Sequence, residues 1–115
     1  MGDPVEDFFV GLGQRGYEPL LQHIAGSIRF DLLHGDEVDH WWVGIDRGRV
    51  TVQHEDREAN SVAKEDRSTL TDVILGRRSA LTTFLRGDAA YAGEGEPLVV
   101  FQRLFPSRAG TGTAP

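Results

Sequence analysis

Residues 26–52 read GSIRFDLLHGDEVDHWWVGIDRGRVTV, and apolar side chains alternate with polar ones in three runs of this stretch, at 28–32, 41–45 and 50–52. A period of two is typical of half-buried β-strands. Only short turns separate the three runs, and parallel strands would need a crossover of about a dozen residues or more. We therefore predict a three-stranded antiparallel meander.

Helices and two weaker strands are predicted on both sides of the meander. Asp3, Pro4 and Glu6 form a capping-box pattern that starts a helix with one apolar stripe. After the meander we expect a weak strand at 59–64, short helices that begin after Asp66 and Ser79, a strand at 89–93, and a helix over 97–105. The prediction is one domain, residues 1–106, and a disordered tail, residues 107–115, which is small and polar.

Composition excludes several functional classes. The 115 residues carry a net charge of −6 and no cysteine, so nucleic acid is a poor partner and neither disulfides nor thiolate metal sites can form. No apolar run approaches the roughly 20 residues of a membrane span, so no stable membrane insertion is expected. The acidic start is unlike a signal peptide, and the last residues are not a peroxisomal address. We expect a cytoplasmic protein.

The glycines at positions 11, 13 and 16 match the G-x-G-x-x-G fingerprint of dinucleotide-binding proteins. That motif functions only between a strand and a helix, where the helix N-terminus meets the pyrophosphate. Here a capped helix precedes the glycines. We interpret them as the end of that helix.

Two histidines and two aspartates lie close together in the first part of the meander. Imidazoles and carboxylates such as His34, Asp36, Asp39 and His40 can bind a divalent metal. They span a turn and the start of a strand, where polar residues collect in any case, so a solvated hairpin is the preferred interpretation. No catalytic constellation is apparent, and we predict a protein that is not an enzyme and holds no metal or cofactor.

Large apolar side chains are the remaining candidates for a functional role. They can fill an ordinary core or surround a cavity. The short strand at 89–92, Ala-Ala-Tyr-Ala, places small side chains against bulky helices. This arrangement either draws the helices close or leaves an apolar cavity. Spacing leaves both possibilities open.

Residues 3–105 resemble the sterol-binding domain of sterol carrier protein type 2. The resemblance rests on the order of elements and on five strings, at 26–31, 41–48, 59–62, 84–87 and 91–93. Asn60 stands where members of that family often carry an aspartate, which leaves a local hydrogen bond in question.

The resemblance implies an α+β fold in which helices cover one face of a five-stranded, largely antiparallel sheet. It also implies non-enzymatic binding of a sterol, fatty acid, acyl-CoA or similar lipid in a tunnel between the sheet and the helices. Its floor and walls would be Phe8, Leu12, Phe30, Leu32, Trp41, Val43, Ile45, Ile74, Phe84, Tyr91, Phe101 and Phe105. The alternative is a protein-interaction or homodimerising module that uses the open sheet face around Trp42, which alternation places opposite the core.

Overall fold

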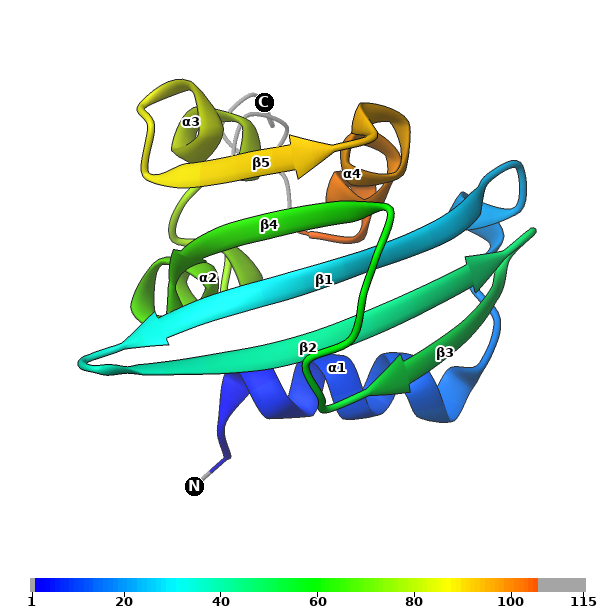
Figure 1. The fold of residues 1–115 in the computed structure, drawn as a ribbon, viewed down its shortest axis with the longest axis horizontal. Helices are drawn as coiled ribbons and strands as arrows, with labels where there is room; N and C mark the ends of the chain where they lie inside the picture. Colours follow the sequence, from blue (N-terminus) through cyan, green and yellow to red (C-terminus); the bar gives the residue numbers. More distant parts are fainter. Residues whose placement is uncertain (1, 106–115) are drawn as a thin grey trace, which may run out of the picture.

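The meander forms the larger half of a single β-sheet. The structure, a computed structural model, describes residues 2–105. Strands β1 (Ala25–His34), β2 (Glu37–Asp46) and β3 (Arg49–Gln53) pair antiparallel, as predicted. The strand order across the sheet is β3-β2-β1-β4-β5 (Figure 1).

A parallel strand pair connects the second half of the sheet to the meander. Strand β4 (Ser61–Asp66) runs parallel to β1, with Ile28 opposite Ser61, and β5 (Ala89–Gly93) is antiparallel to β4. The five-stranded α+β fold is confirmed, and the sheet is mixed, with three antiparallel pairs and one parallel pair. The connection from β3 to β4 passes over the open face of the sheet (Figure 1), which brings β4 in beside β1 in the same direction.

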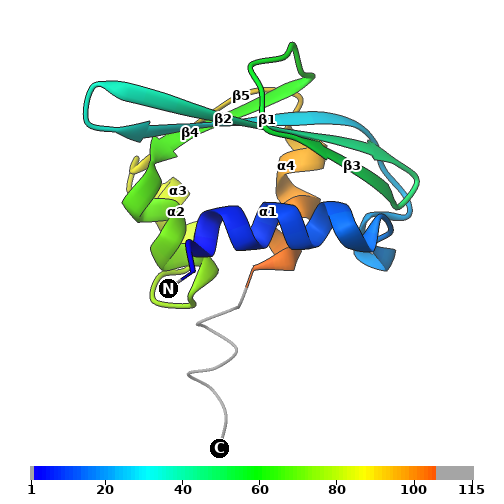
Figure 2. The same ribbon diagram turned by 90° about the horizontal axis from the view of Figure 1, so that it is seen from below.

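All helices lie on the other face of the sheet (Figure 2). They are α1 (Pro4–Arg15), α2 (Arg67–Ile74), α3 (Ala80–Leu85) and α4 (Gly95–Phe101), with short 3-10 turns η1 (Pro19–Leu21) and η2 (Gln102–Leu104). The helical interpretation of the last apolar segment is therefore confirmed. The tail at 107–115, predicted to be disordered, lies outside the described residues.

The glycine fingerprint belongs to α1. The Asp3 carboxylate accepts a hydrogen bond from the Val5 N–H at 3.1 Å and caps the start of the helix, while Gly16, at φ 68°, caps its end. Gly11 and Gly13 lie inside the helix rather than at its end. A Cβ at Gly13 would approach the Cβ of Val52 to 3.2 Å, so this glycine lets α1 pack closely on β3.

Aromatic rings fill the space between α1 and the sheet. Phe9, fully buried, stacks on Trp41 with 5.0 Å between centroids and contacts Phe30 at 5.1 Å. On the other side, Phe30 lies 5.2 Å from Phe101 of α4. Such ring pairs add to the apolar burial that stabilises the fold.

Asn60 joins the two halves of the sheet. Its side-chain Oδ1 accepts hydrogen bonds from the Ser27 N–H at 2.8 Å and the Ser27 hydroxyl at 3.2 Å. The Asn60 N–H donates to the Ser27 Oγ at 3.0 Å. An asparagine oxygen therefore makes the contacts that an aspartate could make, which answers the question raised by the resemblance.

We expect Asn60→Asp to change the free energy of unfolding by less than about 1 kcal/mol, because the acceptor oxygen is retained. Asn60→Leu leaves the Ser27 N–H without its acceptor and should cost about 2 to 3 kcal/mol. Urea unfolding of both variants is the measurement. Equal losses in the two variants would contradict the role given to Oδ1.

Candidate ligand-binding site

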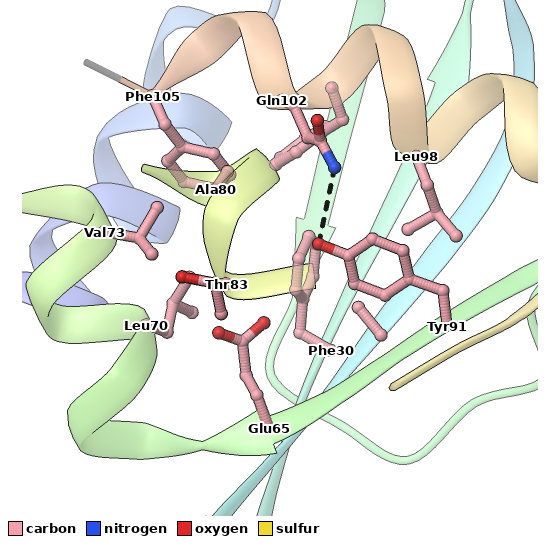
Figure 3. A pocket seen from close by; sticks show the side chains of 12 residues that line it. Phe30, Glu65, Leu70, Val73, Ala80, Thr83, Tyr91, Leu98, Gln102 and Phe105 are labelled. Atoms are coloured by element: carbon pink, nitrogen blue, oxygen red, sulfur yellow. Dashed lines mark hydrogen bonds between the residues drawn. The ribbon is translucent and has the colours of Figure 1, made fainter. Parts of the chain in front are cut away.

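A small cavity lies between the sheet and the helices in the half of the molecule formed by β4, β5 and the last three helices. Its volume is about 20 Å3, which holds roughly one water molecule. Its lining comes from every element on that side (Figure 3): Phe30, Ala63, Glu65, Leu70, Val73, Ala80, Thr83, Tyr91, Leu98, Phe101, Gln102 and Phe105.

Four of the twelve site residues that the resemblance implied line the cavity. These are Phe30, Tyr91, Phe101 and Phe105. Six others fill the core beside it or under α1: Phe8, Leu12, Leu32, Trp41, Val43 and Ile45. Ile74 is half-buried, and Phe84 is 43% exposed and stacks on Tyr91 with centroids 5.0 Å apart.

The helix α3 turns a threonine toward the cavity and its leucines toward solvent. Leu81 and Leu85 are exposed, whereas Thr83 is 1% exposed. The Thr83 hydroxyl donates to the Ser79 carbonyl at 2.8 Å, which satisfies it within its own helix. This short helix can therefore bury a threonine and leave its leucines exposed.

A carboxyl group projects into this largely apolar cavity. Glu65 on β4 is 6% exposed and points toward Leu70 and Thr83 (Figure 3). Burial raises its pKa to about 7; the charge of Arg78 opposes the rise and that of Asp66 adds to it. Arg78 itself pairs with Asp88 at 2.5 Å.

A phenol faces the same cavity from β5. The Tyr91 hydroxyl accepts a hydrogen bond from the Gln102 amide at 3.5 Å (Figure 3). Burial raises the Tyr91 pKa, the charge of Glu65 raises it further, and the Gln102 contact opposes the rise. The phenol is therefore protonated across the neutral range and keeps its own O–H as a donor.

We expect the stability of the protein to fall as the pH rises through Glu65's titration. The folded state keeps this proton up to about pH 7, whereas the unfolded state releases it near pH 4.5, so raising the pH between these values lowers the free energy of unfolding. The loss between pH 5 and pH 8 should be roughly 2 to 3 kcal/mol. Glu65→Gln should remove it in chemical unfolding series at several pH values. The exposed Glu37→Gln is the control and should leave the slope unchanged.

Comparison with solved structures finds several that share this fold. A sterol carrier protein domain 2 from Helicoverpa armigera superposes with a TM-score of 0.71 over 97% of this chain and 91% of that chain, at 16% identity. The chain has the fold of sterol carrier protein 2. The sterol carrier protein 2 of Aedes aegypti, solved in complex with palmitate, superposes with a TM-score of 0.68 over 90% of this chain and 96% of that chain, at 13% identity.

The same fold also occurs as part of a larger enzyme. The sec-alkylsulfatase Pisa1 from a Pseudomonas species matches 87% of this chain with a TM-score of 0.67 and 17% identity, but the match spans only 16% of that enzyme. No protein-family model matches the sequence, and no curated protein does. The likeness to sterol carrier protein 2 is therefore one of fold.

Two of the histidine and aspartate candidates, Asp39 and His40, lie on opposite faces of the sheet. Asp39, beside Trp41, bonds to His54 at 2.5 Å, whereas His40 bonds to Asp31 at 2.8 Å. Within residues 2–105 no group of three or more acidic, histidine or cysteine side chains could hold a metal ion. Over the same residues, no helix has the length and apolar character needed to cross a bilayer.

Asp39 is part of a network that ties the first helix to the second. Arg67, the first residue of α2, bonds to Asp39 at 2.9 Å and to the capping residue Asp3. Burial opposes ionisation of Asp39, but its hydrogen bonds, first from His54, outweigh it and lower its pKa. The network holds helices on the sheet, and none of its residues lines the cavity.

The tryptophan on the open face is covered rather than exposed. Trp42 is half-buried: its indole N–H donates to the Glu58 carbonyl at 3.0 Å, and the Arg57 guanidinium lies 4.1 Å from the ring centroid. The loop between β3 and β4 supplies both contacts. The exposed ring that alternation predicted is therefore not present, and homodimerisation through it stays an untested prediction.

Eight of the lining residues were not predicted from the sequence as site residues: Ala63, Glu65, Leu70, Val73, Ala80, Thr83, Leu98 and Gln102. Glu65 is the charged one among them. Strand β4 buries every second residue, Ser61, Ala63 and Glu65. The predicted strand ended at residue 64, because Asp66 reads as a helix cap. Extending the period of two by one more residue would have placed the glutamate on the helix-covered face.

Proposed function

We propose that this chain binds an apolar small molecule or lipid, without bond chemistry, between its sheet and the helices α2, α3 and α4. The observation that carries the proposal is a cavity at the sheet–helix layer of a sterol carrier protein 2 fold, lined by aliphatic and aromatic side chains. A structural neighbour from Aedes aegypti holds palmitate. Burial of the ligand's apolar surface supplies the binding free energy, at roughly 25 cal/mol per Å2.

Binding requires the helices to move. Pockets for small ligands have volumes of about 300 to 1,000 Å3, and the cavity is far below that range. Phe105 and Gln102 line it and are only half-buried, and they follow directly on α4. Displacement of η2 and the end of α4 from the sheet would enlarge the cavity into the tunnel implied by the resemblance, with the twelve residues named there as its lining.

Titration with a fluorescent sterol and a fluorescent fatty acid tests the proposal. The wild-type protein should show saturable binding to at least one of them. Ala80→Phe places a ring in the cavity and should weaken that binding at least about 10-fold, because the volume is occupied. Ala90→Phe, at an exposed position of β5, is the matched control and should bind like the wild type.

Two results would overturn this function. One is the absence of saturable binding by the wild-type protein with either lipid class. The other is equal binding by Ala80→Phe and Ala90→Phe when both variants are folded by circular dichroism. The second result would place the ligand elsewhere on the molecule.

A further inference from the structure

We propose that the Glu65 cavity selects ligands by their polar end and takes the hydroxyl group of a neutral, long-chain alcohol or sterol in preference to a carboxylate. The proposal rests on the proposed function and names the class of ligand. Glu65 is a specificity-determining residue in it, and the apolar part of the ligand lies along the aromatic and aliphatic walls.

The first support is the position of the carboxyl group. Glu65 is 94% buried, since its exposed fraction is 6%, and its side chain points into the cavity (Figure 3). Among residues 2–105 no hydrogen-bond donor meets it: the Thr83 hydroxyl donates to Ser79, and Arg78 pairs with Asp88. Its oxygens border the open volume of the cavity rather than being sealed in the core, since no fully buried side-chain nitrogen or oxygen among the described residues lacks a partner. A ligand donor placed in that volume can therefore reach the carboxyl group.

The second support is the complementary group on β5. Tyr91 faces the same cavity and, within the described part of the chain, its hydroxyl accepts from Gln102 while its own hydrogen has no acceptor. A ligand hydroxyl in this cavity can donate to Glu65 or accept from Tyr91, two roles that a carboxylate cannot both fill. A hydroxyl also pairs with Glu65 in either protonation state, as a donor to the carboxylate or as an acceptor from the acid.

A fatty-acid carboxylate is disfavoured by charge. It would bring a second negative charge into a cavity that already holds the Glu65 carboxyl group, and two carboxylates in one desolvated site cannot both ionise readily. Over residues 2–105, the groups that act on Glu65 are Arg78, Asp66 and Tyr91. Only Arg78 is positive, and Asp88 already pairs with it.

The experiment compares dodecanol, dodecanoate and dodecylamine as competitors of a neutral fluorescent probe, from pH 6 to pH 8. For the wild-type protein at pH 8 we expect dodecanol to bind at least about 10-fold more tightly than dodecanoate, with the gap closing as the pH falls and Glu65 takes up its proton. In Glu65→Gln the two affinities should lie within about threefold at every pH. Glu37→Gln, exposed on β2, should behave like the wild type.

The inference is overturned if wild-type protein binds dodecanoate as tightly as dodecanol at pH 8, or if Glu65→Gln leaves their ratio unchanged. It is also overturned if dodecylamine outcompetes dodecanol, which would indicate a site for cations. The wild-type comparison needs no variant and stands even if Glu65→Gln fails to fold. If none of the three competitors nor the probe binds, the proposed function itself fails, whereas binding without discrimination refutes only the selection by Glu65.

Discussion

The variant Phe101→Ala is expected to lose about 3 to 5 kcal/mol of unfolding free energy, the range for removing a buried phenylalanine ring. Phe101 is 1% exposed and packs between the sheet and the half-buried rings of Phe8 and Phe105. Its ring lies 5.2 Å from that of Phe30 and 5.8 Å from that of Phe105. Truncation removes these contacts and leaves a void that joins the cavity beside Glu65.

A residue two positions earlier in the chain provides the control for this variant. Val99 lies on the same helix and is 62% exposed. We expect Val99→Ala to change the unfolding free energy by no more than about 0.5 kcal/mol. Chemical unfolding of both variants measures the difference, and a loss below about 1 kcal/mol in Phe101→Ala would show that α4 is not packed as described.

Gly93→Ala should destabilise the protein by more than about 3 kcal/mol, because the position forbids a side chain in two independent ways. Its φ of 89° is a conformation that residues with a Cβ rarely adopt. A Cβ would also collide with the Asn60 carbonyl oxygen and lie 3.0 Å from the Ser61 Cα. Both contacts are with backbone atoms of the neighbouring chain segment, so no side chain can move aside.

Gly95, two residues along the chain, is the matched control. No atom lies within 4 Å of a Cβ built at this position, which begins α4. Gly95→Ala should be neutral or slightly stabilising, since alanine has the higher helix propensity. Thermal unfolding of the two variants decides the matter, and a similar midpoint for both would mean that β5 does not approach β4 at Gly93.

The meander and the short elements after it could be predicted from the sequence because their signals are local. Alternation at Phe30, Trp41 and Val43 and the cap at Asp3 each depend on a few neighbouring residues. The short strand at 89–93 was also located correctly. Local patterns of this kind determine which residues form an element and which of its faces is apolar.

Features that depend on pairing between residues far apart in the sequence could not be predicted from the spacing of apolar residues. The parallel register of Ile28 with Ser61 joins residues separated by a long connection, and no local pattern encodes it. The exposure of Leu81 and burial of Thr83 depend on how one short helix is rotated on its neighbours. The cover over Trp42 comes from a loop whose path no periodicity describes.

The same parallel register orders the assembly of the domain. Strand β1 meets β2 through a tight turn, so that this pairing closes a short loop, whereas the pairing of β1 with β4 must close one of 33 residues, from 28 to 61. Loop closure costs more conformational entropy as the loop lengthens, and contacts distant in sequence form late. We therefore expect the meander to form first and β4 and β5 to join it later with the last three helices, so that the late pairing is also the one that encloses Glu65.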